Sequence, residues 1–300
     1  MKEKRSHARR MGFSIIELMV VIGILAILIA ALLPFLGGSS DSAECVKCKN
    51  NMKNLAMAVI SCAQANDLGH FPAAGYYRTI GVDTEGPYYY PHNSWISNKG
   101  KSLNSTVRKM DSGSVVHFKD SEDDCRDAIK NGVIWSATGA SFEIYRCPIH
   151  VREFEKKNKR PPWWSFMMNQ EFGYAEDNSK PKHFCGASIH GPFKGHNHDK
   201  VLMFAEVQGI DVDVKTSKGR IKLEAVNSGD KTDAVLAYSQ NEVMGFNHKL
   251  GKNKYGGNVA FADGHVDTIG MPTDGAYMKD LTRYLCQGVD VPHDGSKYTP

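Results

Sequence analysis

Three residues near the N-terminus have the types and spacing for proteolytic processing followed by ion pairing. Gly12 precedes Phe13, and Glu17 stands four residues after Phe13. Hydrolysis of the Gly12–Phe13 bond would create an α-amino group on Phe13, and side chains four residues apart are neighbours on one helix. The same amine could instead meet Glu17 of a neighbouring chain in a staggered assembly. We therefore predict that Glu17 pairs with an amine that cleavage creates.

A second group of side chains consists of good zinc or copper ligands. One polar stretch gathers five of them: His183, Cys185, His190, His196 and His198. Their spacing matches no established zinc finger, and surface histidines are the favoured interpretation. Cys45 and Cys48 form a C-x-x-C without a matching second pair, which disfavours a zinc or redox site. We expect no metal and no cofactor.

Seven cysteines leave at least one thiol free or paired between molecules, and the sequence does not define the connectivity. The sequence contains no recognised catalytic motif: it has no nucleophile elbow, no His-Glu-x-x-His and no phosphate-binding loop. We expect a protein that is not an enzyme.

Basic and apolar segments surround the processing residues. Residues 1–12 carry five basic side chains and one acidic one, which accounts for the net charge of +4 and gives no support to a nucleic-acid partner. In residues 13–36 the only charged side chain is Glu17. About 20 apolar residues cross a bilayer as a helix, and the basic flank stays in the cytoplasm. We predict a single-pass inner-membrane helix at 13–36, followed by an exported chain that is periplasmic or extracellular.

The run "RRMGFSIIELMVVIGILAILIAALLPFL" resembles the N-terminal signal of type IV pilins and type II secretion pseudopilins. The resemblance implies cleavage after Gly12 by prepilin peptidase, N-methylation of Phe13 and a role for Glu17 in assembly. Pro34 stands where such chains commonly carry a helix-kinking proline. The implied partners are prepilin peptidase, other pilin or pseudopilin subunits, an inner-membrane assembly platform and the membrane. A simple signal anchor with an incidental glutamate is the alternative.

The stretch "NHKLGKNKYGGNVAFADGHV" resembles the C-terminal signature of a prepilin-associated family, in which a His is followed after nine residues by Asp-Gly. Here fourteen residues separate His248 from Asp263. With His265, these side chains could form a metal or ligand site near a hairpin. The favoured interpretation is structural, because Asp263-Gly264 is a preferred type I′ turn pair and histidines supply hydrogen bonds.

Local patterns predict the elements that position these residues. A helix is expected from residue 13 to about 67, with the stripe Leu55, Ala56, Val59, Ile60 and Ala63 packed on a head. Shorter helices are expected at 121–132 and 275–288, and strands at 141–148, 200–207 and on both sides of Asp263-Gly264. The predicted organisation is a leader (1–12), a transmembrane half-helix (13–36), an amphipathic half-helix (37–69) and a globular head (70–300).

The predicted fold is α+β, a pilin-like long helix packed on an antiparallel sheet with large loops. The predicted function is a prepilin-like subunit of a type II secretion pseudopilus or a type IV pilus-like filament. The alternative is a filament-displayed or membrane-anchored module that binds polysaccharide or another envelope ligand. Six aromatic residues could form the ligand-binding surface of such a module or could build the core of the head, and the core is favoured. They are Tyr88, Tyr89, Tyr90, Trp95, Trp163 and Trp164.

Overall fold

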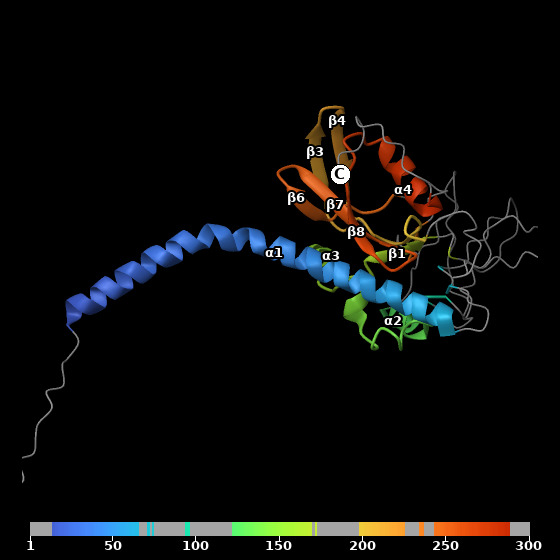
Figure 1. The fold of residues 1–300 in the computed structure, drawn as a ribbon, viewed down its shortest axis with the longest axis horizontal. Coiled ribbons are helices and arrows are strands. Elements are labelled where there is room, and N and C mark those ends of the chain that lie inside the picture. Colours follow the sequence, from blue (N-terminus) through green and yellow to red (C-terminus); the bar gives the residue numbers. More distant parts are fainter. Residues whose placement is uncertain are drawn as a thin grey trace, which may run out of the picture. The chain divides into compact units, whose positions relative to one another are not determined.

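The computed structural model describes residues 14–65, 71–72, 74, 94–96, 122–169, 172, 198–225, 234–236 and 243–288, with the side chains of 31–40, 122–124 and 235 excepted. The chain divides into two compact units, Met1–Ala43 and Glu44–Pro300. Four α-helices and eight strands are described (Figure 1).

Helix α1 (Ile15–Ala65) is continuous over 51 residues and passes through Gly37 and Gly38. In the first unit its apolar side chains are exposed, with Ile15 77% and Ile27 71% accessible. No helix among the described residues has the length and hydropathy that a membrane crossing requires. Part of the predicted membrane segment, residue 13 and the side chains from residue 31 on, lies outside the described residues.

The part of α1 that belongs to the second unit is amphipathic, as predicted. Leu55, Ala56, Val59 and Ala63 are fully buried, and Ile60 is partly buried. Asn50, Lys53 and Asn54 are exposed on the other face. The apolar stripe therefore packs on the head, which supplies the stabilisation that a single helix lacks in water.

The main sheet has six strands, in the order β5-β1-β2-β7-β6, with β8 paired to β7. Their bounds are β1 Phe166–Asn169, β2 Leu202–Glu206, β5 Val235–Leu236, β6 His248–Gly251, β7 Lys254–Phe261 and β8 Val266–Gly270. A separate antiparallel pair consists of β3 Val212–Thr216 and β4 Gly219–Leu223. The α+β prediction fits this architecture. The expected wholly antiparallel sheet needs one correction, because β5 pairs with β1 in parallel.

Helices cover both faces of this sheet (Figure 1). Successive strand side chains point to opposite faces, so Phe166 and Met168 join a core with α1, α2 (Glu122–Asn131) and α3 (Pro148–Asn158). Met167, between them, joins a second core with α4 (Tyr277–Gln287). The head therefore has three layers, with the sheet in the middle.

The strand predicted at 141–148 is wrong. Phe142–Tyr145 forms a 3-10 helix and Pro148 begins α3. The side-chain amide of Asn51 on α1 donates to the carbonyls of Glu143 and Arg146, at 3.0 and 2.9 Å. These carbonyls are thus bound to a helix side chain instead of a neighbouring strand.

The predicted hairpin at Asp263-Gly264 is confirmed, but its type I′ turn is not. Gly264 has φ +90°, whereas Asp263 is absent from the positive-φ residues of the described chain. The Gly264 N–H donates to Phe261 O (2.9 Å) and the Phe261 N–H to His265 O (3.0 Å). These bonds enclose a three-residue loop in which a type I turn is followed by a left-handed glycine.

Gly257 on β7 lies where the sheet approaches a neighbouring backbone segment. A Cβ added there would lie 1.9 Å from the Gly245 carbonyl oxygen. We expect Gly257→Ala to lower the free energy of unfolding by about 3 kcal/mol, because backbone must move to accommodate the methyl group. Gly251 on β6 is the matched control, since a Cβ there meets nothing within 4 Å. Denaturant unfolding followed by tryptophan fluorescence measures both variants, and equal stability would contradict the close approach.

Candidate functional site

The first turn of α1 contains Glu17, the predicted assembly residue. Gly12 and Phe13 lie outside the described residues. The backbone N–H of Ser14 donates to Glu17 Oε2 at 2.9 Å, and the Ile16 N–H lies 3.4 Å from Ser14 Oγ. Ser and Glu at this spacing form a capping box, which satisfies N–H groups at a helix N-terminus. Glu17 is also exposed, so its second carboxylate oxygen is open to a further partner.

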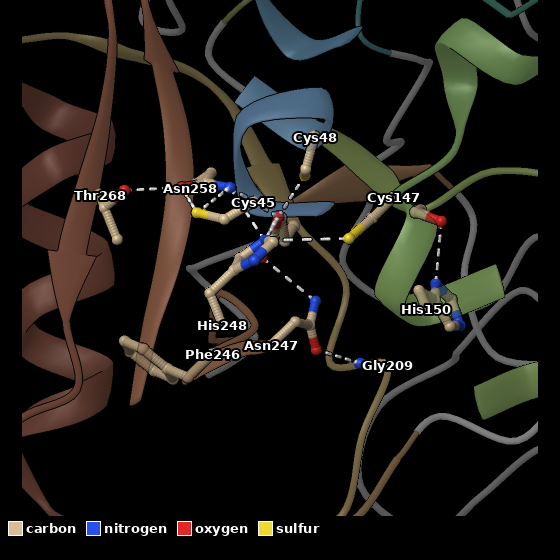
Figure 2. A network of polar contacts seen from close by, with 12 residues as sticks. Cys45, Cys48, Cys147, His150, Gly209, Phe246, Asn247, His248, Asn258 and Thr268 are labelled. Atoms are coloured by element: carbon tan, nitrogen blue, oxygen red, sulfur yellow. Dashed lines mark hydrogen bonds and ion pairs between the residues drawn. The ribbon is translucent and has the colours of Figure 1, made fainter. Parts of the chain in front are cut away.

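A second candidate site lies inside the head, where four potential metal ligands from distant segments converge. Figure 2 labels three of them, Cys48, Cys147 and His248. We call Cys48, Cys147, Glu206 and His248 the Cys–His–Glu cluster; their ligand atoms all lie within 4.8 Å of one another. The first comes from α1, the second is the N-cap of α3, and the others lie on β2 and β6. All four are at most 1% accessible.

Three donor-bearing atoms crowd around one oxygen of the cluster. Glu206 Oε1 lies 2.7 Å from Cys48 Sγ, 2.7 Å from His248 Nε2 and 3.3 Å from Asn258 Nδ2. Cys147 Sγ lies 3.8 Å from the same His248 nitrogen. A carboxylate oxygen has two lone pairs. Three donor-bearing atoms around Glu206 Oε1 are therefore one more than its lone pairs can accept from in ordinary hydrogen bonds.

Two asparagines, Asn247 and Asn258, hydrogen-bond to the cluster and are themselves held by further hydrogen bonds. Asn247 Nδ2 donates to Glu206 Oε2 at 3.2 Å, and its Oδ1 accepts from the Gly209 N–H at 2.7 Å. Asn258 Oδ1 accepts from Thr268 Oγ1 at 2.7 Å, which turns the Asn258 amide nitrogen toward the cluster (Figure 2). These bonds fix the carboxylate orientation, so the convergence is built into the surrounding backbone and strands.

The electrostatics of the cluster are dominated by burial and by the carboxylate. Burial opposes the charged imidazolium of His248, but the Glu206 carboxylate and the neighbouring hydrogen bonds outweigh it and raise the pKa of His248 to about 12. Burial, together with Cys147 and Glu206, raises the pKa of Cys48 well above its usual range. These raised pKa values favour the protonated forms of His248 and Cys48. His248 Nδ1 has no hydrogen-bond partner among the described residues.

The structure separates the residues of the predicted C-terminal signature. His248 belongs to the buried cluster, whereas His265 lies in the exposed hairpin turn, 2.6 Å from Asp263 Oδ1 and stacked on Phe261. The favoured structural interpretation fits Asp263, Gly264 and His265. It describes His248 incompletely, because His248 contacts two potential metal ligands.

The structure describes only some of the predicted metal ligands and aromatic residues. His183, Cys185, His190 and His196 are among those outside, as are Tyr88, Tyr89 and Tyr90. Trp95, Trp163 and Trp164 are buried, at 0, 7 and 2% accessible, which confirms the core interpretation for these three residues.

Sequence reasoning did not predict the cluster. Successive members are separated by 42 to 99 positions along the chain, and no local spacing relates them. One signal was present, because Glu206 closes the apolar strand "VLMFAE". A carboxylate at a buried strand position needs a partner.

His150 on α3, next to the cluster, makes the stability of the head depend on pH. It is 3% accessible, and burial lowers the pKa of His150 from 6.5 to about 4. Between those values the unfolded chain takes up a proton that the folded chain does not, so stability falls as the pH drops from 6.5 to 4. At about 1.4 kcal/mol per pKa unit the loss is on the order of 3 kcal/mol. Unfolding measured across this range should show a flatter pH dependence in His150→Gln; an unchanged slope would contradict the assignment.

Comparison with known proteins identifies one region of the chain. Residues 9–33 match the family described as the prokaryotic N-terminal methylation motif. The chain carries a prepilin-type N-terminus. The match includes Gly12, Phe13 and Glu17, is consistent with a type IV pilin-like protein and suggests membrane anchoring through the N-terminal helix. No curated protein and no solved structure matches the chain.

Proposed function

We propose that this chain is a structural subunit of a pseudopilus or pilus-like filament. Prepilin peptidase cleaves it after Gly12, and Phe13 is N-methylated. Before assembly the subunit is anchored in the inner membrane with its head exported. An assembly platform then adds it to a type II secretion pseudopilus or a type IV pilus-like filament. The observation that carries the proposal is the methylation motif at 9–33.

The structure of α1 supports this proposal. From Ile15 to Ile29 the helix exposes large apolar side chains on all its sides. Such a surface is stable only in lipid or against other apolar helices. A membrane provides the first environment before assembly, and the bundled helices of a filament provide the second afterwards. No catalytic role is part of the proposal.

A filament-displayed module that binds polysaccharide is a weaker candidate. It requires aromatic side chains exposed together as a stacking surface. Trp95, Trp163 and Trp164 are buried and contribute to the core instead. The aromatic residues that the structure describes therefore give this alternative no support.

Replacement of Gly12 tests the processing step. We expect Gly12→Val to accumulate as a precursor that retains the 12-residue leader, because the resemblance implies a peptidase that requires glycine before the cut. Gly23→Ala is the matched control, since it adds a methyl group within the same apolar segment and meets nothing within 4 Å. Intact mass of both proteins from membranes gives the answer, and normal cleavage of Gly12→Val would contradict the proposal.

A further inference from the structure

We propose that the Cys–His–Glu cluster binds one structural zinc ion. The inference is independent of the proposed filament function, because it rests on side chains of the head alone. The cluster supplies two sulfur atoms, one imidazole nitrogen and one carboxylate oxygen. These are the ligand types of zinc in proteins, and four of them complete the tetrahedral coordination of a structural site.

The separations between the ligand atoms suit a tetrahedral ion. Zinc–ligand bonds of about 2.0–2.3 Å place neighbouring ligand atoms about 3.3–3.8 Å apart. The separation of 3.8 Å between Cys147 Sγ and His248 Nε2 already fits. The two contacts of 2.7 Å, from Glu206 Oε1 to Cys48 Sγ and to His248 Nε2, need to open by about 0.6–0.8 Å. Changes of side-chain torsion angles supply shifts of this size without moving a strand.

Zinc also resolves the crowding around Glu206 Oε1. With the ion at the common centre, both thiols release their protons, His248 is neutral with Nε2 as ligand, and Glu206 stays ionised. The sulfur and nitrogen atoms then bind the metal instead of competing for one oxygen. Asn247 continues to donate to Glu206 Oε2, which is the kind of outer contact that orients a ligating carboxylate.

Burial makes the site structural. With every ligand at most 1% accessible, no described surface opens to a substrate, and four protein ligands leave no free coordination position. The ion joins α1 to the N-terminus of α3 and to strands β2 and β6. It therefore ties the part of α1 that belongs to the second unit to the rest of the head.

A disulfide between Cys48 and Cys147 is the competing use of the same sulfur atoms in an exported protein. It would leave Glu206 and His248 as an ion pair without a metal. Both states protect the thiols from alkylation in the folded protein. They differ after denaturation with a chelator, since zinc release frees both thiols and a disulfide does not.

The test uses the full chain, extracted from membranes in detergent and purified through a tag without histidines. We expect about one zinc ion per chain by plasma mass spectrometry, with Cys48 and Cys147 both alkylated after denaturation with a chelator. Cys48→Ser and Cys147→Ser should each reduce zinc to background. Cys62→Ser should retain it, because this cysteine lies on the same helix but outside the cluster.

The absorption spectrum of the cobalt-substituted wild-type chain tests the metal site even if the variants fail to fold. Protein produced with cobalt in place of zinc should show thiolate-to-metal charge transfer and the visible bands of tetrahedral coordination. Three results would overturn the proposal: a Cys48–Cys147 disulfide in the wild type, wild-type protein without metal or cobalt bands, or full zinc content in folded Cys48→Ser and Cys147→Ser.

Discussion

Replacement of Glu17 with alanine is expected to abolish filament formation while leaving cleavage after Gly12 intact. Glu17 is the only charged side chain of the apolar run, and it is exposed in the first turn of α1. In the proposed filament we expect its partner to be the amine of Phe13 on a neighbouring subunit, and methylation keeps that amine charged. Without the carboxylate, the amine would stay unpaired in an apolar environment. An unpaired charge at membrane depth costs at least ~2.5–3.5 kcal/mol, which weakens each contact more than about 50-fold.

The capping contact of Glu17 with Ser14 requires a control, because alanine also removes this helix cap. Glu17→Gln keeps an oxygen that accepts from the Ser14 N–H and removes only the charge. We expect Glu17→Gln to fail in assembly as Glu17→Ala does, and Ser14→Ala, which keeps the carboxylate, to assemble. Sheared filaments counted by electron microscopy and immunoblotting provide the measurement. Wild-type numbers of filaments from Glu17→Gln would show that capping, and not ion pairing, is the role of Glu17.

Replacement of Glu206 with glutamine is expected to lower the free energy of unfolding of the head by about 3–5 kcal/mol. The carboxylate is fully buried and forms an ion pair with His248 at 2.7 Å. Its loss leaves a buried imidazolium without its counter-charge, or removes one ligand of the zinc ion. Either consequence is large compared with the stability of a typical domain.

Glu44→Gln provides the matched control for Glu206→Gln. Glu44 pairs with Arg152 at 2.5 Å, but the Arg152 side chain is 40% accessible, so this pair is screened by water. We expect a change below about 1 kcal/mol. All four tryptophans lie between residues 95 and 164, and fluorescence during denaturation therefore reports on the head. Equal effects of the two substitutions would show that the cluster contributes no more than a surface ion pair.

The parts of the fold that the sequence predicted are those with a strong local pattern. The stripe that includes Leu55 and Val59 has helical spacing and is buried, and the alternating residues beside Asp263-Gly264 form β7 and β8. The strand expected at 141–148 failed because Asn51, about 90 positions earlier, binds its carbonyls. Alternation describes which side chains are apolar, but it carries no information about which group binds the backbone.

The two candidate sites also differ in whether a local sequence pattern reveals them. Gly12, Phe13 and Glu17 lie within six positions, so their chemistry can be recognised before any folding is considered. The Cys–His–Glu cluster exists only after a helix, a helix N-terminus and two strands have packed together. Cys48 belonged to a C-x-x-C without a second pair; the other potential ligands come from three other segments of the head.

The mass of the N-terminal peptide of the mature protein tests the central claim most directly. Protein isolated from the membranes or filaments of its own cells should yield a peptide that begins at Phe13 and is one methyl group heavier than its sequence. A peptide that begins at Met1, at another residue, or at an unmodified Phe13 would contradict the assignment of this chain as a processed and methylated prepilin-like subunit.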